Sequence, residues 1–125
     1  MCVTISQLAI VSVPISDPDA AIAFYVGVLG CELIDDTPMG PTMRWVRVAP
    51  KGAETSLTLV TWFPTMAPGS TKGLLFNTDA LDDDIAMLQS KGIEVSAVSE
   101  EAWGRYVTFD DPDGNGIILR GAVSP

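Results

Sequence analysis

Hydrophobic and polar positions along the first part of the chain change from the period of a strand to that of a helix. Residues 8–15 (LAIVSVPI) are rich in β-branched side chains and predict a strand. Asp17 and Pro18 predict the start of a helix, because the carboxylate accepts an unpaired N–H and proline loses no hydrogen bond there. Gly30 can supply a left-handed helix end. The apolar residues of this helix recur at spacings of three and four: Ala21, Ile22, Tyr25 and Val28 with Leu29.

Strand-like runs follow this helix, and the second half of the chain repeats the same order. Three strands of the first half are expected at residues 31–34, 44–48 and 57–62. In the second half, Asp79 can cap a helix with Leu81, Ile85 and Leu88 on one face, which Lys91 and Gly92 can end. Its strands are expected at residues 74–78, 93–98, 105–109 and 116–120.

The two halves also align with each other. An offset of 63 residues superposes Asp19 on Asp82, and an offset of 61 superposes residues 44–46 on 105–107. We therefore predict an α+β fold of two βαβββ repeats that form a curved mixed sheet with a concave pocket and helices on the outer face. The prediction is a single domain over residues 1–125, with repeat one at 5–62, a linker at 63–72 and repeat two at 73–122. Prolines and a glycine indicate a connecting segment, and a lid over the pocket is the alternative.

Strand alternation divides the side chains of the sheets between two faces. The helix-facing set is the predicted core: Val11, Val13, Ile15, Val46, Val48, Leu57, Leu59, Leu74, Phe76, Val107, Phe109, Ile117 and Leu119. The opposite face mixes aromatic, aliphatic and polar groups, which is typical of small-molecule pockets, although a surface packed against a partner subunit is the alternative. The candidate ligand-binding residues on that face are Ser12, Trp45, Arg47, Thr58, Trp62, Asn77, Tyr106, Thr108 and Ile118.

Composition and charge narrow the function classes. The net charge is −9, and the seven Lys and Arg residues are scattered, so nucleic-acid and anionic-membrane binding are not expected. No apolar run approaches the roughly 20 residues of a membrane-spanning helix. Cys2 and Cys31 do not suggest a disulfide framework, and no signal peptide is visible, so a cytoplasmic location is expected.

Nucleophilic or acid–base chemistry has little support in the sequence. The chain has no histidine, and no base is predicted on the candidate pocket face. Arg47 is charged and lies in mid-strand, so it either pairs with a carboxylate such as Glu54 or one of another subunit, or it clamps an anionic ligand group. Trp45, Trp62 and Tyr106 either stack on a planar ligand or serve as ordinary packing. The catalytic residues, if any, are unknown.

Four motifs in order resemble one known superfamily. Residues 17–25 (DPDAAIAFY) with 28–30 (VLG) look like the first helix of the vicinal oxygen chelate superfamily, which includes glyoxalases, bleomycin-resistance proteins and extradiol dioxygenases. Residues 44–50 (RWVRVAP) look like its third strand. Trp103 with Gly104, followed by residues 109–115 (FDDPDGN), looks like its closing hairpin. The resemblance covers roughly residues 8–120 and implies this fold, but a fold does not fix function.

The resemblance also implies where a metal would be held. Members that use a divalent metal take His, Gln or Glu from the first and fourth strands of each half. The matching positions here are Ile10, Gly73 and Ile118, with the fourth at or next to Thr58. These residues are not ligands for transition metals, which need imidazole, thiolate or carboxylate donors placed together. We therefore expect no metal and no cofactor.

Three functions remain open, in order of preference. The first is a metal-free protein that binds or sequesters a small hydrophobic or aromatic molecule, like the bleomycin-resistance branch of the superfamily. The second is a diverged lyase, isomerase or dioxygenase acting on a small metabolite, and the third is a protein-interaction module without a ligand. A homodimer is expected under all three, because related folds commonly complete their pockets across a two-fold axis.

Overall fold

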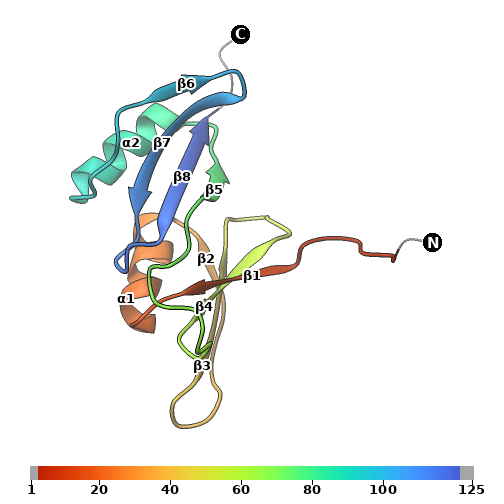
Figure 1. Cartoon of the computed structure of the whole chain (residues 1–125). Coiled ribbons are helices and arrows are strands. Elements are labelled where there is room, and N and C mark those ends of the chain that lie inside the picture. Colours follow the sequence, from red (N-terminus) through yellow and green to blue (C-terminus); the bar gives the residue numbers. More distant parts are fainter. Residues whose placement is uncertain (1–2, 122–125) are drawn as a thin grey trace. The chain divides into compact units, whose positions relative to one another are not determined.

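Each half of the chain forms its own four-stranded sheet (Figure 1). In the computed structural model, which describes residues 3–121, the strand orders are β1-β4-β3-β2 and β5-β8-β7-β6. The chain divides into two compact units, Met1–Met66 and Ala67–Pro125. In both sheets the first strand of the unit pairs in parallel with the fourth, and the other neighbours pair antiparallel. This order confirms the predicted α+β fold of two βαβββ repeats.

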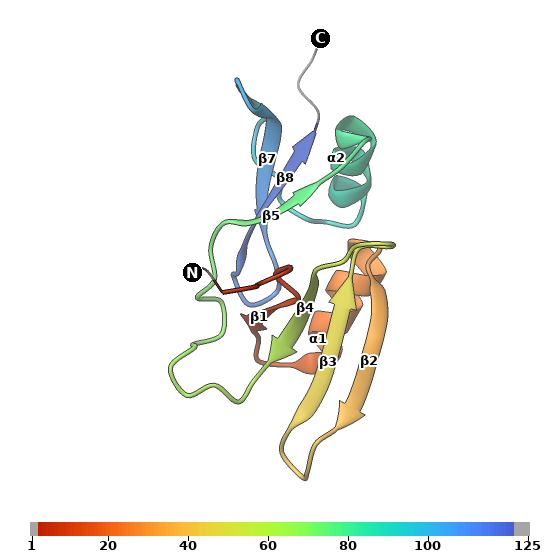
Figure 2. The ribbon, with the colours of Figure 1, turned by 90° about the vertical axis from the view of Figure 1, so that its right-hand side faces the viewer.

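The helices and strands occur in the predicted order. The first unit contains β1 (Ile10–Pro14), α1 (Pro18–Ile22), the π-helical turn η1 (Ala23–Val28), β2 (Glu32–Pro38), β3 (Arg44–Ala49) and β4 (Ser56–Val60). The second contains β5 (Leu74–Asn77), α2 (Leu81–Ser90), β6 (Ser99–Glu101), β7 (Gly104–Asp110) and β8 (Gly116–Gly121). Figure 2 shows each helix against one face of its own sheet, and α1 contacts β4 while α2 contacts β8.

The first helix begins as predicted but continues as a π-helix. Asp17 is the N-cap and accepts the Asp19 N–H at 3.0 Å. From Ala23 the hydrogen bonds reach one residue further back, as in Leu29 N–H to Phe24 O at 2.9 Å. The wider turn puts both Phe24 and Tyr25 into the core, where the predicted α-helical spacing placed Tyr25 alone.

The cap of the second helix differs from the prediction. Ala80 is the N-cap of α2, and Asp79 makes no cap hydrogen bond. Instead, the Thr78 hydroxyl accepts the Ala80 N–H at 3.1 Å and bonds to the Asp84 carboxylate. The prediction that Asp79 caps this helix is therefore wrong, because the threonine one residue earlier satisfies the helix start.

Two predicted strand bounds are also wrong. Residues 93–98 are not a regular strand. The Thr108 N–H donates to the Ser96 hydroxyl at 2.9 Å, whereas in a regular sheet it would donate to a backbone carbonyl oxygen. The strand of this region is β6, which begins at Ser99. Trp62 lies two residues beyond the end of β4, so strand alternation does not determine where its side chain points.

The end of the predicted linker is fixed to the β7–β8 turn within the second unit. Asn115 Oδ1 accepts the Thr71 N–H at 3.0 Å, and the Gly116 N–H donates to Thr71 O at 2.8 Å. Gly69 has a φ of +80°, and a Cβ there would lie 2.1 Å from the Asp113 carbonyl oxygen. These contacts make residues 69–72 a part of the second unit, so they argue against a lid in this part of the linker.

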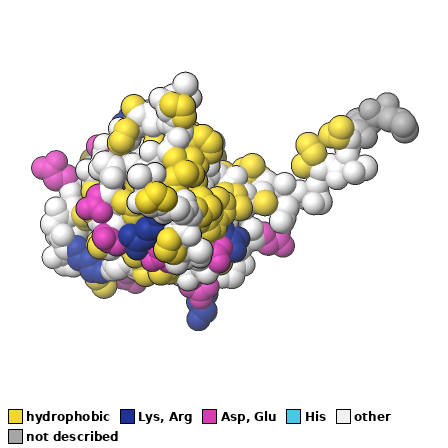
Figure 3. All heavy atoms as spheres, turned by 90° about the horizontal axis from the view of Figure 1, so that it is seen from below, with side chains coloured by type: hydrophobic (Ala, Val, Ile, Leu, Met, Phe, Trp, Pro, Cys, Tyr) yellow, Lys and Arg dark blue, Asp and Glu magenta, His cyan; other side chains and the backbone are white. Residues whose placement is uncertain are grey.

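The core of each unit lies between its sheet and its helix. Most of the predicted helix-facing residues are buried, namely Val13, Ile15, Val46, Val48, Leu57, Leu59, Val107, Phe109 and Ile117. The others of that set, Val11, Leu74, Phe76 and Leu119, are partly exposed. Leu8 and Ala9 still accept hydrogen bonds from residues 55 and 56, whereas residues 3–7 lie beyond the sheet of the first unit. Figure 3 shows hydrophobic side chains along this N-terminal segment. Its exposed hydrophobic residues are Val3, Ile5 and Leu8.

Candidate functional site

A row of polar side chains crosses all four strands of the first unit. Ser12 on β1 is the register partner of Thr58 on β4, Thr58 that of Arg47 on β3, and Arg47 that of Asp35 on β2. The hydroxyl oxygens of Ser12 and Thr58 lie 3.1 Å apart, and Arg47 Nε donates to Asp35 Oδ2 at 2.8 Å. Every neighbour in the row is thus held by a hydrogen bond or by strand pairing.

Two tryptophans lie beside this polar row. Trp45 is on β3, two residues before Arg47, and its indole Nε1 donates to Asp35 Oδ2 at 3.3 Å. Trp62 stacks on Trp45 with ring centroids 6.4 Å apart and an interplanar angle of 29°. The first unit therefore gathers five predicted site residues, which are Ser12, Trp45, Arg47, Thr58 and Trp62.

Asp35 is a side chain of this face that the sequence did not indicate. The prediction offered Glu54 or another subunit as the partner of Arg47, and the structure gives Asp35 instead. A register shift between Leu33 and Asp35 brings the carboxylate opposite Arg47. Because Arg47 has this partner, the face of the first unit carries one internally compensated ion pair.

The second unit presents a different set on the corresponding face. Asn77 on β5 is the register partner of Arg120 on β8, which in turn is the partner of Tyr106 on β7. Arg120 Nε donates to Asn77 Oδ1 at 2.8 Å. Trp103, in the turn before β7, stacks on Tyr106 at a centroid distance of 4.9 Å and an angle of 16°.

Arg120 also lies near the tryptophan ring. Its guanidinium carbon is 6.0 Å from the centroid of Trp103, within the range of a cation–π contact. Asn77 and Tyr106 were predicted site residues, whereas Arg120 and Trp103 were not. The signal for Arg120 was its strand parity, because it lies two residues after Ile118 and hence on the same face.

Thr108 and Ile118 form a neighbouring row on the second sheet. They are register partners of each other, and Ile118 also pairs with Leu75 on β5. Thr108 is exposed, Ile118 is partly exposed and Leu75 is exposed. This row corresponds in the repeat to the row of Ser12, Thr58 and Arg47, so the polar groups of the first unit are largely replaced by aliphatic ones in the second.

The four family metal positions do not fit a metal ion in this chain. Ile10 and Ile118 have hydrocarbon side chains, and Gly73 has none. The Thr58 hydroxyl is buried and already bonded to Ser12. Among residues 3–121, no group of three or more His, Cys, Asp or Glu side chains is arranged to hold a metal. Transition-metal sites need such donors, so no catalytic step through a metal follows from these side chains.

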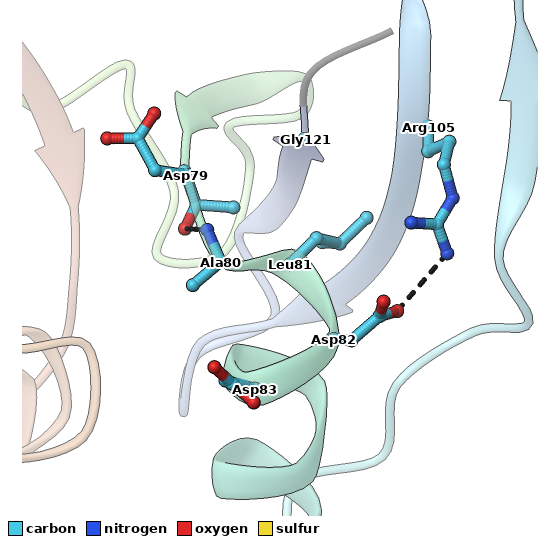
Figure 4. A pocket seen from close by; sticks show the side chains of 8 residues that line it. Asp79, Ala80, Leu81, Asp82, Asp83, Arg105 and Gly121 are labelled. Atoms are coloured by element: carbon cyan, nitrogen blue, oxygen red, sulfur yellow. Dashed lines mark hydrogen bonds and ion pairs between the residues drawn. The ribbon is translucent and has the colours of Figure 1, made fainter. Parts of the chain in front are cut away.

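A shallow hollow lies on the helix side of the second unit, at the start of α2. Figure 4 shows Arg105 pointing toward Asp82, with Asp79 and Asp83 directed elsewhere. Arg105 Nη2 donates to Asp82 Oδ1 at 3.1 Å. Exposed carboxylates at a helix start are ordinary solvated groups, so this hollow gives no reason to prefer it over the sheet faces.

The ion pair in this hollow has a counterpart in the first unit. Arg44 donates to Asp19, in the first turn of α1, at 2.8 Å and to Asp36 on β2 at 2.7 Å. Arg105 likewise lies between Asp82 and Glu100 on β6, the latter at 3.6 Å. The hydrogen bonds from Arg44 lower the pKa of Asp36. These arginines tie each helix to its sheet and are not part of the candidate site.

Cys31 does not supply a nucleophile. It is buried at the end of the first helix, and burial raises the pKa of its thiol to about 11. The thiolate is the reactive form, so this cysteine is inert at neutral pH.

Comparison with known proteins identifies the family. The model of the Glyoxalase/Bleomycin resistance protein/Dioxygenase superfamily matches residues 5–119. The chain belongs to this superfamily. Among its members, TnmS3, an antibiotic binding protein from Streptomyces sp. CB03234, is 49% identical, with a TM-score of 0.91 over 97% of this chain and 99% of that one.

Two further proteins are similar to this chain over most of their length. A glyoxalase/bleomycin resistance protein from Streptomyces sp. CB03234 is 52% identical, with a TM-score of 0.83 over 91% of this chain and 99% of that one. The uncharacterized protein YetH of Bacillus subtilis (strain 168) is 32% identical over 93% of this chain and 98% of its own length. No helix within residues 3–121 is long and apolar enough to cross a membrane.

Proposed function

We propose that this chain is a binding protein that sequesters a small hydrophobic or aromatic molecule without a metal ion. The observation that carries the proposal is the presence of stacked aromatic rings on the sheet faces, together with family metal positions that hold no metal ligand. Trp45 stacks on Trp62, and Trp103 stacks on Tyr106. Stacked aromatic side chains favour planar or apolar ligands. The candidate ligand-binding set is the nine predicted residues, joined by Asp35, Trp103 and Arg120.

The relatives support the same function. TnmS3 is an antibiotic binding protein, and the two chains are 49% identical over an alignment that covers 97% of this chain. Because a shared fold does not determine a ligand, the identity of the bound molecule is left to experiment. The proposal keeps the cytoplasm as the place of action, which cysteine usage favours.

The proposal extends to a homodimer. The exposed hydrophobic residues of the N-terminal segment, Val3, Ile5 and Leu8, are 79%, 81% and 65% exposed. Exposed apolar side chains gathered in one segment are typical of a contact with another chain. Light scattering on the purified protein should give twice the mass of 13.2 kDa, and a mass of one chain at all concentrations would exclude the dimer.

One experiment tests the function and separates it from the enzymatic alternative. The protein is purified without chelators, its metal content is measured by elemental analysis, and its thermal unfolding is recorded with a panel of aromatic antibiotics and aromatic metabolites. We expect substoichiometric metal and a raised Tm with at least one panel compound, because a ligand that binds only the folded state stabilises it. Stoichiometric iron, zinc, nickel or manganese would favour an enzyme, and no shift with any compound would favour an interaction module.

A further inference from the structure

We propose that Arg120, Asn77 and the Trp103–Tyr106 stack form a subsite of the second unit for a planar aromatic ring that carries a carboxylate. This inference rests on the proposed function and specifies the ligand chemistry at one place. It starts from a difference among the four arginines of the chain.

Arg120 stands apart because no acidic side chain of residues 3–121 forms an ion pair with it. Arg44, Arg47 and Arg105 each form an ion pair with at least one carboxylate. Within residues 3–121, the recorded side-chain hydrogen bond of Arg120 goes to the neutral amide of Asn77. In a chain of net charge −9, carboxylates are abundant, yet none pairs with Arg120 in this part of the chain.

The geometry leaves Arg120 able to bind an anion. Its Nε is engaged by Asn77, which fixes the plane of the guanidinium and leaves the terminal nitrogens as donors. A guanidinium held in this way matches the two oxygens of a carboxylate. Arg120 is also partly buried, so an ion pair there is less screened than one on an open surface.

Trp103 supplies the aromatic part of the subsite. Trp103 is 47% exposed as a residue, although the Tyr106 ring stacks on its indole at a centroid distance of 4.9 Å. Because Tyr106 covers one face of the indole, the exposed area lies on its other face and edges. A planar ligand ring can stack there while its acidic group reaches the guanidinium, 6.0 Å from the indole centroid.

The face of the first unit offers no equivalent. Arg47 is paired with Asp35 at 2.8 Å, and Trp45 donates to the same carboxylate oxygen. An incoming carboxylate would therefore meet Asp35 as a like charge. Arg105 provides a matched control, because it lies on the helix side of the same unit, outside the candidate site, and its Arg→Gln substitution should not alter a preference for acids.

The test compares three probes by NMR titration of the full chain: 2-naphthoate, 2-naphthamide, which has nearly the same size without the charge, and the smaller cyclohexanecarboxylate. The wild type should bind 2-naphthoate about tenfold more tightly than 2-naphthamide, the factor expected for one charge-assisted pair. Cyclohexanecarboxylate, which has the charge without the flat ring, should bind more weakly than 2-naphthoate. The Trp103 indole signal should move with both naphthalene probes.

The variants assign the preference to Arg120. Arg120→Gln should reduce the acid preference to below about twofold, while Arg105→Gln, with the same change of net charge, should leave it unchanged. Arg120→Lys, which retains the charge but loses the planar fork, should give an intermediate ratio and covers the case in which Arg120→Gln unfolds.

Equal binding of the acid and the amide by the wild type would overturn the inference, as would an acid preference that survives in Arg120→Gln. If neither naphthalene probe binds but a compound of the wider panel raises the Tm, this subsite is wrong and the binding function stands. If nothing in either set binds, both proposals fail.

Discussion

The sheets of the two units have the same strand order, but the charged side chains on their faces have different partners. In the first unit, Arg47 and Asp35 compensate each other at 2.8 Å beside Trp45. In the second, Arg120 faces the amide of Asn77 and the ring of Trp103. A duplicated scaffold can thus vary the polarity of a face by changing a few positions on alternate strand residues, while the helix-facing core keeps its apolar character.

The turns that join the third and fourth strands differ in a similar way. The β7–β8 turn is built around the buried Asp111 and Asn115, with Asn115 Nδ2 donating to Asp111 Oδ2 at 2.7 Å. The β3–β4 turn is exposed, and its Thr55 hydroxyl donates to Leu8 O at 2.7 Å. The second turn is therefore held by buried polar bonds, and the first by exposed ones.

The largest effect should come from Asn115→Ala. Asn115 is 0% exposed and bonds to both the Asp111 carboxylate and the Thr71 N–H, so its loss removes two side-chain hydrogen bonds from this turn. We expect a loss of about 2–4 kcal/mol of unfolding free energy. Thr55→Ala, in the exposed turn of the first unit, should cost less than about 1 kcal/mol. Chemical denaturation of both variants measures the difference, and equal losses would contradict the contrast between the turns.

The second effect compares two glycines with nearly the same backbone. Gly69 and Gly52 have φ values of +80° and +77°, but only at Gly69 would a Cβ meet another atom, the Asp113 carbonyl oxygen at 2.1 Å. Gly52→Ala should cost about 1 kcal/mol for the left-handed backbone alone, and Gly69→Ala about 2–3 kcal/mol. Denaturation midpoints measure both. Similar costs would mean that residues 69–72 are not held against the β7–β8 turn.

Local signals allowed much of the fold to be predicted. Asp17, Pro18 and Gly30 mark the first helix through their own chemistry, so its bounds follow from the sequence. The π-helical turn at Ala23–Val28 was not predictable, because it depends on burying Phe24 and Tyr25 together. Residues 93–98 read as a strand from their apolar alternation, but the Ser96 side chain interrupts the ladder.

The candidate site was predictable only where strand parity applies. Parity predicted Arg47, Thr58 and Tyr106 as candidate site residues, but a register shift after Leu33 determines that Asp35 becomes the partner of Arg47. Trp103 lies in a turn, where no periodicity says which way a side chain points. Partners that depend on irregular backbone therefore required the structure.

The stability of the first unit should depend on pH through Cys31, which follows the glycine at the end of the first helix. The residue at the same place in the second unit is Ile93, which does not titrate. Burial raises the thiol pKa from 9.0 to about 11, so between these values the unfolded chain loses this proton and the folded chain keeps it. The unfolding free energy should therefore fall as the pH rises from 9 to 11, by up to about 2 kcal/mol from this group. To isolate this contribution, the unfolding free energy is measured against pH with and without Cys31→Ala, and the two curves are subtracted. Both chains carry Cys2→Ser, so that Cys31 is the cysteine that differs between them. A flat difference profile would mean that the thiol is not desolvated.

The smallest effect should come from the duplicated ion pairs. Arg44 makes three close bonds, to both oxygens of Asp36 and to Asp19, whereas Arg105 makes one bond to Asp82 at 3.1 Å and lies 3.6 Å from Glu100. Both sites are solvent-accessible, so each Arg→Gln substitution should destabilise the fold only slightly, with Arg44→Gln the more destabilising because its bidentate geometry is better. High salt should reduce the two costs and bring them closer together, since it screens exposed charges. Thermal unfolding of both variants at low and high salt tests this order. A larger loss of stability for Arg105→Gln than for Arg44→Gln would contradict the prediction.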